Sequence, residues 1–393
     1  MESSISLVHP IPSASRASTT ALPWYCYAVV FGAMCIPIGA LWDISWHSTI
    51  GRDTFWTPAH IVIYLGGLIP GLSCGWLAFQ STFLASPIER APTVRLWKFH
   101  APLGAWVTLW GAVAMVTSAP FDNWWHNAYG LDVEILSPPH TVLAAGMYAV
   151  ALGALLLVLS WQNRVVMEQG TASFLFVFTA GVLLAMSTII VTEKSFPNQQ
   201  HTGSFYKISC AIYPLYLVIA ARASRLRWSA TRAALIYMLL VAGMVWILPL
   251  FPARPQLAPI YNPVDHMVPP AFPLLLVVPA LAIDFLVARF GPEARGLRDW
   301  MLAGAIGAGF LTILLAVQWF FSSFLLSSFA QNWLFAGGQH WPYFVQPGEW
   351  QNRYWRLNED SITLRGLSAA LGLAIIKSRM ALWLANWMRN VKR

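Results

Sequence analysis

The chain has 393 residues, of which 57% are hydrophobic and only 10% charged. Soluble domains carry about 25% charged residues, so this composition excludes an ordinary soluble protein and favours a membrane protein. The net charge of +8 comes mainly from Lys and Arg between apolar runs, where they set membrane orientation, so it does not indicate nucleic-acid binding.

The Ser/Thr-rich stretch 1–21 predicts a short disordered tail without the basic region of a signal peptide. Apolar runs of about 18 residues or more follow it, long enough to cross a bilayer, and at that depth they must be helical. They predict an all-α polytopic membrane bundle of nine or ten helices. The expected helices are residues 22–42, 58–84, 101–120, 139–161, 172–192, 207–223, 233–250, 271–289 and 300–325, with a less certain tenth at 363–387.

The distribution of basic residues predicts the orientation. Lys and Arg collect in the loops after the second, fourth, sixth and eighth expected helices, and cytoplasmic loops are rich in these residues. We therefore expect a cytoplasmic N-terminus in a plasma (inner) membrane. Most histidines then fall on the outer side, where the long loops 251–270 and 326–362 are placed to cap a polar site.

A repeated Asp/His pattern is the main functional signal. In each copy an Asp and a His lie four residues apart at the end of one expected helix, and a second His begins the next helix. A spacing of four places both side chains on one helix face. The repeat consists of Asp43, His47 and His60, the first triad, and Asp122, His126 and His140, the second triad.

Two imidazoles and one carboxylate suit copper, iron or zinc, and the order of affinities favours copper. Three protein ligands also leave positions open for water, dioxygen or substrate. The alternative is that these polar groups only cap helix ends near the membrane surface. We expect Arg52, Asp53 and Asp132 to contact and orient the ligand side chains without binding the metal themselves. Asp265 and His266, just before the eighth expected helix, are weaker candidates for the same site.

The stretch 43–60 has the spacing D-x3-H-x12-H and ends in RDT-x2-TP-x-H. It resembles the copper-binding membrane subunit of particulate methane and ammonia monooxygenases, which carries a copper site with that pattern. The family's second site is N-x3-H-x13-H, and here Asp122 stands in place of the Asn. The resemblance covers about residues 40–160 and implies one or two copper ions, on the outer side of the membrane, beside a site that activates dioxygen.

The resemblance implies a component of a copper-dependent monooxygenase that oxidises a small apolar substrate with dioxygen and needs partner subunits. Residues 22–165 would form the metal-binding module and residues 166–393 additional helices. Two alternatives remain open. One is non-catalytic copper storage or delivery, which the 12 scattered Met do not favour. The other is a transporter or sensor, which the like orientation of the two copies does not favour.

Overall fold

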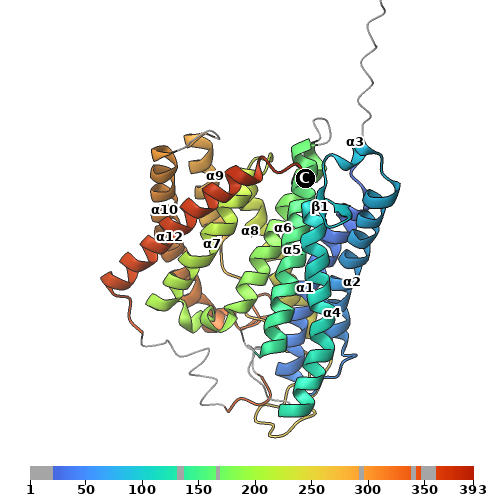
Figure 1. The fold of residues 1–393 in the computed structure, drawn as a ribbon. Helices are drawn as coiled ribbons and strands as arrows, with labels where there is room; N and C mark the ends of the chain where they lie inside the picture. The colour runs from blue at the N-terminus through green and yellow to red at the C-terminus, as the bar shows by residue number, and fades with distance from the viewer. Residues whose placement is uncertain (1–20, 131–136, 165–168, 292–295, 338–341, 347–359) are drawn as a thin grey trace, which may run out of the picture.

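The computed structural model describes residues 21–130, 137–164, 169–291, 296–337, 342–346 and 360–393. Nearly all regular structure in these ranges is helical, as Figure 1 shows. Nine of the described helices are long and apolar enough to cross a membrane. The predictions of an all-α polytopic bundle and an integral membrane protein are confirmed, while the expected disordered tail lies almost wholly outside the described residues.

The first half of the chain forms a bundle of four long helices. They are α1 (Trp24–Thr49), α2 (Pro58–Phe79, continued by the π-helical turn Gln80–Leu84), α4 (Leu103–Tyr129) and α5 (Pro138–Arg164). Between α2 and α4 lie the short helix α3 (Pro87–Arg90) and an antiparallel hairpin of β1 (Val94–Leu96) and β2 (Phe99–Ala101).

In the part of the second half that the structure describes, there are six longer helices and four short 3-10 turns. The helices are α6 (Gln169–Ile190), α7 (Gly203–Ala223), α8 (Ser229–Ile247), α9 (Val277–Phe290), α10 (Leu297–Leu325) and α12 (Leu364–Met388). The 3-10 turns are Thr192–Lys194, Pro197–Gln199, Leu248–Leu250 and Ser328–Ala330. In Figure 1, α12 runs obliquely across the helices of this half, and it packs on α7 and α10.

Small residues allow the helices of the first half to pack closely. A Cβ atom added at Gly111 on α4 would lie 2.7 Å from the carbonyl oxygen of Gly146 on α5. Such small-residue contacts are typical of helix association in membranes, where packing replaces the hydrophobic driving force. The α2 helix packs on both α1 and α4, so the ends of α1, α2, α4 and α5 are brought together.

The expected membrane helix at 271–289 is wrong in its first part. The chain is irregular up to Leu276, and α9 begins only at Val277 and has 14 residues. Pro269, Pro270 and Pro273 explain the late start, because proline lacks an N–H donor and disfavours helical geometry in the preceding residue. The less certain tenth segment, in contrast, is one continuous helix, α12.

The irregular segment before α9 is buried, and other helices satisfy its backbone. The amide of Leu274 donates to the Tyr237 hydroxyl at 2.9 Å, and the amide of Leu275 donates to Gln318 Oε1 at 3.0 Å. Non-helical backbone at membrane depth is tolerated where protein groups replace water in this way.

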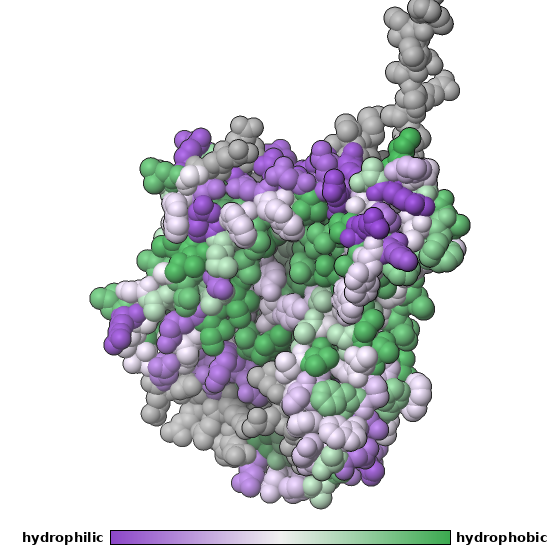
Figure 2. Space-filling model, in the orientation of Figure 1, coloured by the Kyte–Doolittle hydropathy of each residue, from purple (hydrophilic) through white to green (hydrophobic). Residues whose placement is uncertain are grey.

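The surface of the molecule is consistent with a membrane environment. Figure 2 shows hydrophobic side chains across the middle of the visible face, with hydrophilic side chains gathered towards its two ends. Large apolar side chains such as Leu72 and Phe320 are each 74% exposed on spanning helices. These side chains are positioned to contact lipid rather than water.

Candidate metal centre

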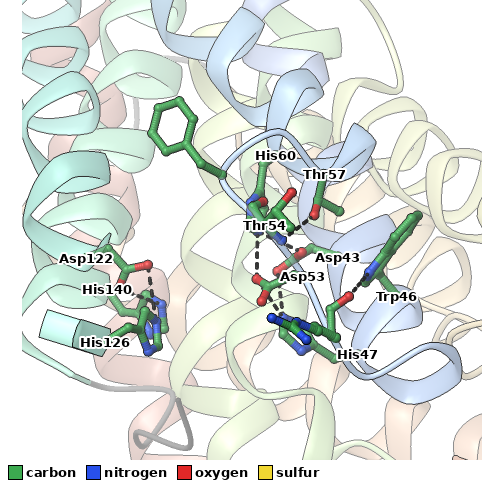
Figure 3. A network of polar contacts seen from close by, with 12 residues as sticks. Asp43, Trp46, His47, Asp53, Thr54, Thr57, His60, Asp122, His126 and His140 are labelled. Carbon is green, nitrogen blue, oxygen red and sulfur yellow. Dashed lines mark hydrogen bonds and ion pairs between the residues drawn. The ribbon is translucent and has the colours of Figure 1, made fainter. Parts of the chain in front are cut away.

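The first triad forms where α1 ends and α2 begins, and a fourth residue joins it. His60 Nε2 lies 3.1 Å from Asp43 Oδ1 and 3.4 Å from Asp53 Oδ2. His47 Nε2 lies 3.5 Å from Asp53 Oδ2 and 3.8 Å from Asp43 Oδ2. We call these four residues the first cluster; Figure 3 shows their side chains converging from two helices and the loop between them.

Local hydrogen bonds fix the shape of this loop. Thr57, directly before α2, accepts a hydrogen bond through its hydroxyl from the amide of Thr54 at 2.8 Å. Trp46 on α1 donates from its indole to the carbonyl of Arg52 at 2.9 Å. The chain between the two helices is thereby folded back so that Asp53 points at the two histidines, as Figure 3 shows.

The orientation of His60 is set by its other ring nitrogen. His60 Nδ1 lies 2.9 Å from the carbonyl oxygen of Thr54, so Nδ1 carries the proton and donates. In the neutral ring, Nε2 then has a lone pair and faces the carboxylates of Asp43 and Asp53. A carbonyl behind a histidine is the usual arrangement for a metal ligand, because it fixes both tautomer and ring direction.

One carboxylate oxygen of this cluster lacks a hydrogen-bond donor. Asp43 Oδ1 is buried and accepts no hydrogen bond from the described residues. Its nearest polar neighbour, His60 Nε2, is itself an acceptor when the ring is neutral. Converging acceptors without a donor are costly unless a cation or a proton lies among them. The donor set therefore fits a metal ion, and ligand atoms of Asp43, Asp53 and His60 lie within 4.8 Å of one another.

The second triad is assembled in the same way at the end of α4 and the start of α5. Asp122 lies 3.4 Å from His126 and 3.3 Å from His140, measured from the carboxylate oxygens to Nε2. Asp122 Oδ1 is buried and, like Asp43 Oδ1, accepts no hydrogen bond from the described residues. We call Asp122, His126 and His140 the second cluster; their ligand atoms also lie within 4.8 Å of one another.

The described hydrogen bonds at the second cluster come from Gly130 and Ser137. His126 Nδ1 lies 3.2 Å from the carbonyl oxygen of Gly130, and the Ser137 hydroxyl accepts a hydrogen bond from the amide of His140 at 3.4 Å. Asp132, expected to orient these ligands, lies outside the described residues. Both clusters are at the same end of the bundle, and Figure 3 shows them in one field of view.

Asp53 takes a more direct part than the sequence suggested. We expected it behind the ligands, paired with Arg52, but its carboxylate lies among the ligand atoms. The described ion pairs of Asp53 run to His47 and His60, while Arg52 is exposed and contributes its backbone carbonyl. A hydrogen bond with His47 lowers the pKa of the Asp53 carboxyl, against the opposing effect of desolvation.

The additional candidates Asp265 and His266 pair with each other. His266 Nδ1 lies 2.7 Å from Asp265 Oδ1, and the Asp265 side chain is 85% exposed. This hydrogen bond lowers the pKa of the Asp265 carboxyl. The two residues are not among the converging ligand atoms of either cluster.

The chain was compared with known protein families, curated proteins and solved structures. No protein-family model, no curated protein and no solved structure matches the chain.

Proposed function

We propose that this protein binds metal ions at the first and second clusters, and that copper is the metal. One observation carries the proposal. Each cluster contains a buried carboxylate oxygen that accepts no hydrogen bond from the described residues and faces imidazole nitrogens; these oxygens are Asp43 Oδ1 and Asp122 Oδ1. A divalent cation would satisfy these oxygens and the facing nitrogens at once.

Copper is preferred over iron and zinc for two reasons. Mixed imidazole and carboxylate ligands suit all three metals, but copper binds most tightly in the general order of affinities. The resemblance of the stretch 43–60 to the membrane subunit of particulate monooxygenases also implies copper at this position. Bound copper would supply one-electron chemistry with dioxygen.

The protein would act as the metal-binding membrane component of a monooxygenase-like complex. The clusters lie at one end of membrane helices, where a small apolar substrate dissolved in the bilayer can approach them. Their side chains are partly exposed, between 20% for His60 and 48% for His47, so small molecules have access. Reductant and partner subunits would come from outside the chain.

The orientation we propose places the clusters outside and the N-terminus in the cytoplasm of a plasma (inner) membrane. It is supported by the basic residues at the opposite end of the bundle. Arg164 ends α5, Arg222 lies in the last turn of α7, and Arg289 lies in the last turn of α9. Such residues favour the cytoplasmic side.

The test is the metal content and the electron paramagnetic resonance spectrum of the protein purified in mild detergent. Wild type is compared with His60→Ala and His140→Ala, each of which removes one imidazole from one cluster. We expect copper at both clusters, with each variant losing its own signal. Absence of copper after reconstitution would refute the metal assignment. Copper without dioxygen-dependent substrate oxidation in the assembled complex would instead favour storage or delivery.

A further inference from the structure

The end of α1, which carries half of the first cluster, is held by residues more than 200 positions later in the chain. The carbonyl of Ser48 accepts a hydrogen bond from the amide of Tyr343 at 3.0 Å, and the carbonyl of Ile50 accepts one from the amide of Gln256 at 2.9 Å. The last carbonyls of a helix have no partner within it. Here two of them are satisfied by the second half of the protein.

A third hydrogen bond comes from the same region. The hydroxyl of Thr49 accepts from the amide of Val268 at 2.8 Å, and it donates to the carbonyl of Ser45 one turn earlier at 2.6 Å. Thr49 is fully buried. Three consecutive residues, 48–50, directly after His47, are thus fixed by partners outside their own helix.

The partners are themselves tied together. The carbonyl of Tyr343 accepts from the amides of Tyr261 and Asn262, at 2.8 and 3.0 Å. The loop that contains these two residues is closed at its base, where the amide of Met267 donates to the carbonyl of Phe251 at 3.0 Å. We call residues 251–268 and 342–345 together the strap.

The strap contacts the first hairpin at a glycine that has a counterpart in the second. Gly51 has φ of +91°, and the Tyr343 ring occupies the place where a Cβ atom of residue 51 would lie. Gly130, at the equivalent position of the repeat, has φ of +102° and no described atom within 4 Å of that place. The described part of the chain shows no hydrogen bond from the strap to α4.

We infer that the strap is a positioning element for the first cluster, which orders that cluster's ligands before metal binds. The inference rests on the proposed metal binding and assigns a role to the second half of the chain. By fixing residues 48–50, the strap holds His47 and the start of the loop that carries Asp53 in place before a metal ion binds. Ligands that are already ordered bind more tightly because less ordering free energy is lost on binding.

The test compares two glycine variants that introduce the same backbone strain. Gly51→Ala and Gly130→Ala both place a Cβ at positive φ, but only Gly51→Ala displaces Tyr343. Each is made in a His140→Ala protein, to read the first cluster alone, and in a His60→Ala protein, to read the second. Copper affinity is measured by competition with a chelator. A milder variant, Thr49→Val, removes the acceptor of the Val268 amide while keeping the side-chain shape.

We expect Gly51→Ala and Thr49→Val to weaken copper binding at the first cluster by about tenfold or more, as loss of outer hydrogen-bond partners does. Binding at the second cluster should change less than about twofold in these two variants. Equal losses at both clusters, or none at the first, would overturn the inference.

Amide hydrogen exchange gives a readout that needs no metal. In Thr49→Val, exchange at residues 48–54 should accelerate while exchange at 126–130 stays as in wild type. If wild type binds no metal, the proposed function fails, and the ordering of the loop by the strap is judged by this exchange pattern. If exchange accelerates but copper affinity at the first cluster does not change, the positioning role is refuted while metal binding stands.

Discussion

The first and second clusters come from one repeated pattern, and the strap joins the first of them to the second half of the chain. The described ligands of the first cluster include two carboxylates, Asp43 and Asp53, and those of the second include Asp122, while Asp132, the counterpart of Asp53 in the repeat, lies outside the described residues. With neutral imidazoles, the two carboxylates of the first cluster carry a formal charge of −2, which a divalent cation neutralises.

The loop of the first cluster is held by Thr57, by Trp46 and by the strap. At the second cluster, the described hydrogen bonds are those of His126 with Gly130 and of His140 with Ser137, and the connecting residues 131–136 lie outside the described ranges. The two copies of the repeat therefore share their ligand spacing, and the strap is a contribution of the rest of the fold to the first copy.

The largest expected effect is the loss of a central carboxylate. Asp43→Ala should abolish binding at the first cluster, weakening copper affinity by more than about a hundredfold, beyond the usual cost of losing an outer partner. Asp122→Ala should do the same at the second cluster. Metal analysis with paramagnetic resonance checks both variants. If either variant emptied both clusters, the two would be one coupled site and the comparison would fail.

The second prediction removes one carboxylate charge from the first cluster. Asp53→Asn should lower copper affinity there by about tenfold, because one anionic ligand is lost while the loop remains. The measurement is the same chelator competition in the His140→Ala protein. An unchanged affinity would return Asp53 to the supporting role suggested by the sequence.

Asp53 also predicts a pH dependence in the metal-free protein. Because its pKa is lowered in the folded state, its contribution to stability is complete above the unfolded value of about 4 and is lost as pH falls through the folded value. Asp53→Asn should remove this loss, so wild type and variant should converge in stability as the pH is lowered. The check is thermal unfolding between neutral and acid pH; a constant difference would contradict it.

A smaller effect, confined to the second half, is expected at Asp284 on α9. Its carboxylate accepts from the amides of Ala230 and Thr231 and from the Thr231 hydroxyl, at 2.7 to 3.1 Å, and so caps the start of α8. Asp284→Ala should cost about 0.5–2 kcal/mol of stability, the usual value for a helix N-cap. Metal content should be unchanged; its loss would show that the capping of α8 by Asp284 affects the clusters.

The smallest effect is expected at the pair formed by the exposed Asp265 and the partly buried His266. Asp265→Asn should leave the copper content of both clusters as in wild type, since neither residue faces their ligand atoms. Exposed ion pairs contribute little to stability, so the unfolding temperature should also change little. Loss of copper would restore this pair as a ligand candidate.

Hydropathy and residue spacing predicted much of this architecture. The start of α2, which carries His60, follows from a proline at a helix start, which is a local property. Apolar length located the first and third expected helices but ended them at residues 42 and 120, whereas α1 and α4 continue to Thr49 and Tyr129 and carry the first two ligands of each triad. The irregular start of α9 was missed because apolar content outweighed three prolines in the prediction. The direct role of Asp53 was missed because the path of its loop depends on Thr57 and Trp46, whose hydrogen bonds have no sequence period.

The strap was foreseen only as long outer loops placed to cap a site. Its contacts with residues 48–50 are backbone hydrogen bonds, and backbone groups are the same in every residue, so the sequence carries no direct signal of them. Gly51 and Gly130 occupy equivalent positions of the repeat, but only the structure shows that Tyr343 packs against Gly51.

The length of chain between Ser48 and Tyr343 has a consequence for biosynthesis. All ligands of the second cluster lie within the segment from Asp122 to His140, so its hairpin can close as soon as α5 has entered the membrane. The first cluster leaves the ribosome earlier, but the hydrogen bond from Tyr343 that fixes the end of α1 forms only when most of the chain has been translated. The hairpin of α1 and α2 is therefore synthesised early but receives its hydrogen bond from Tyr343 late.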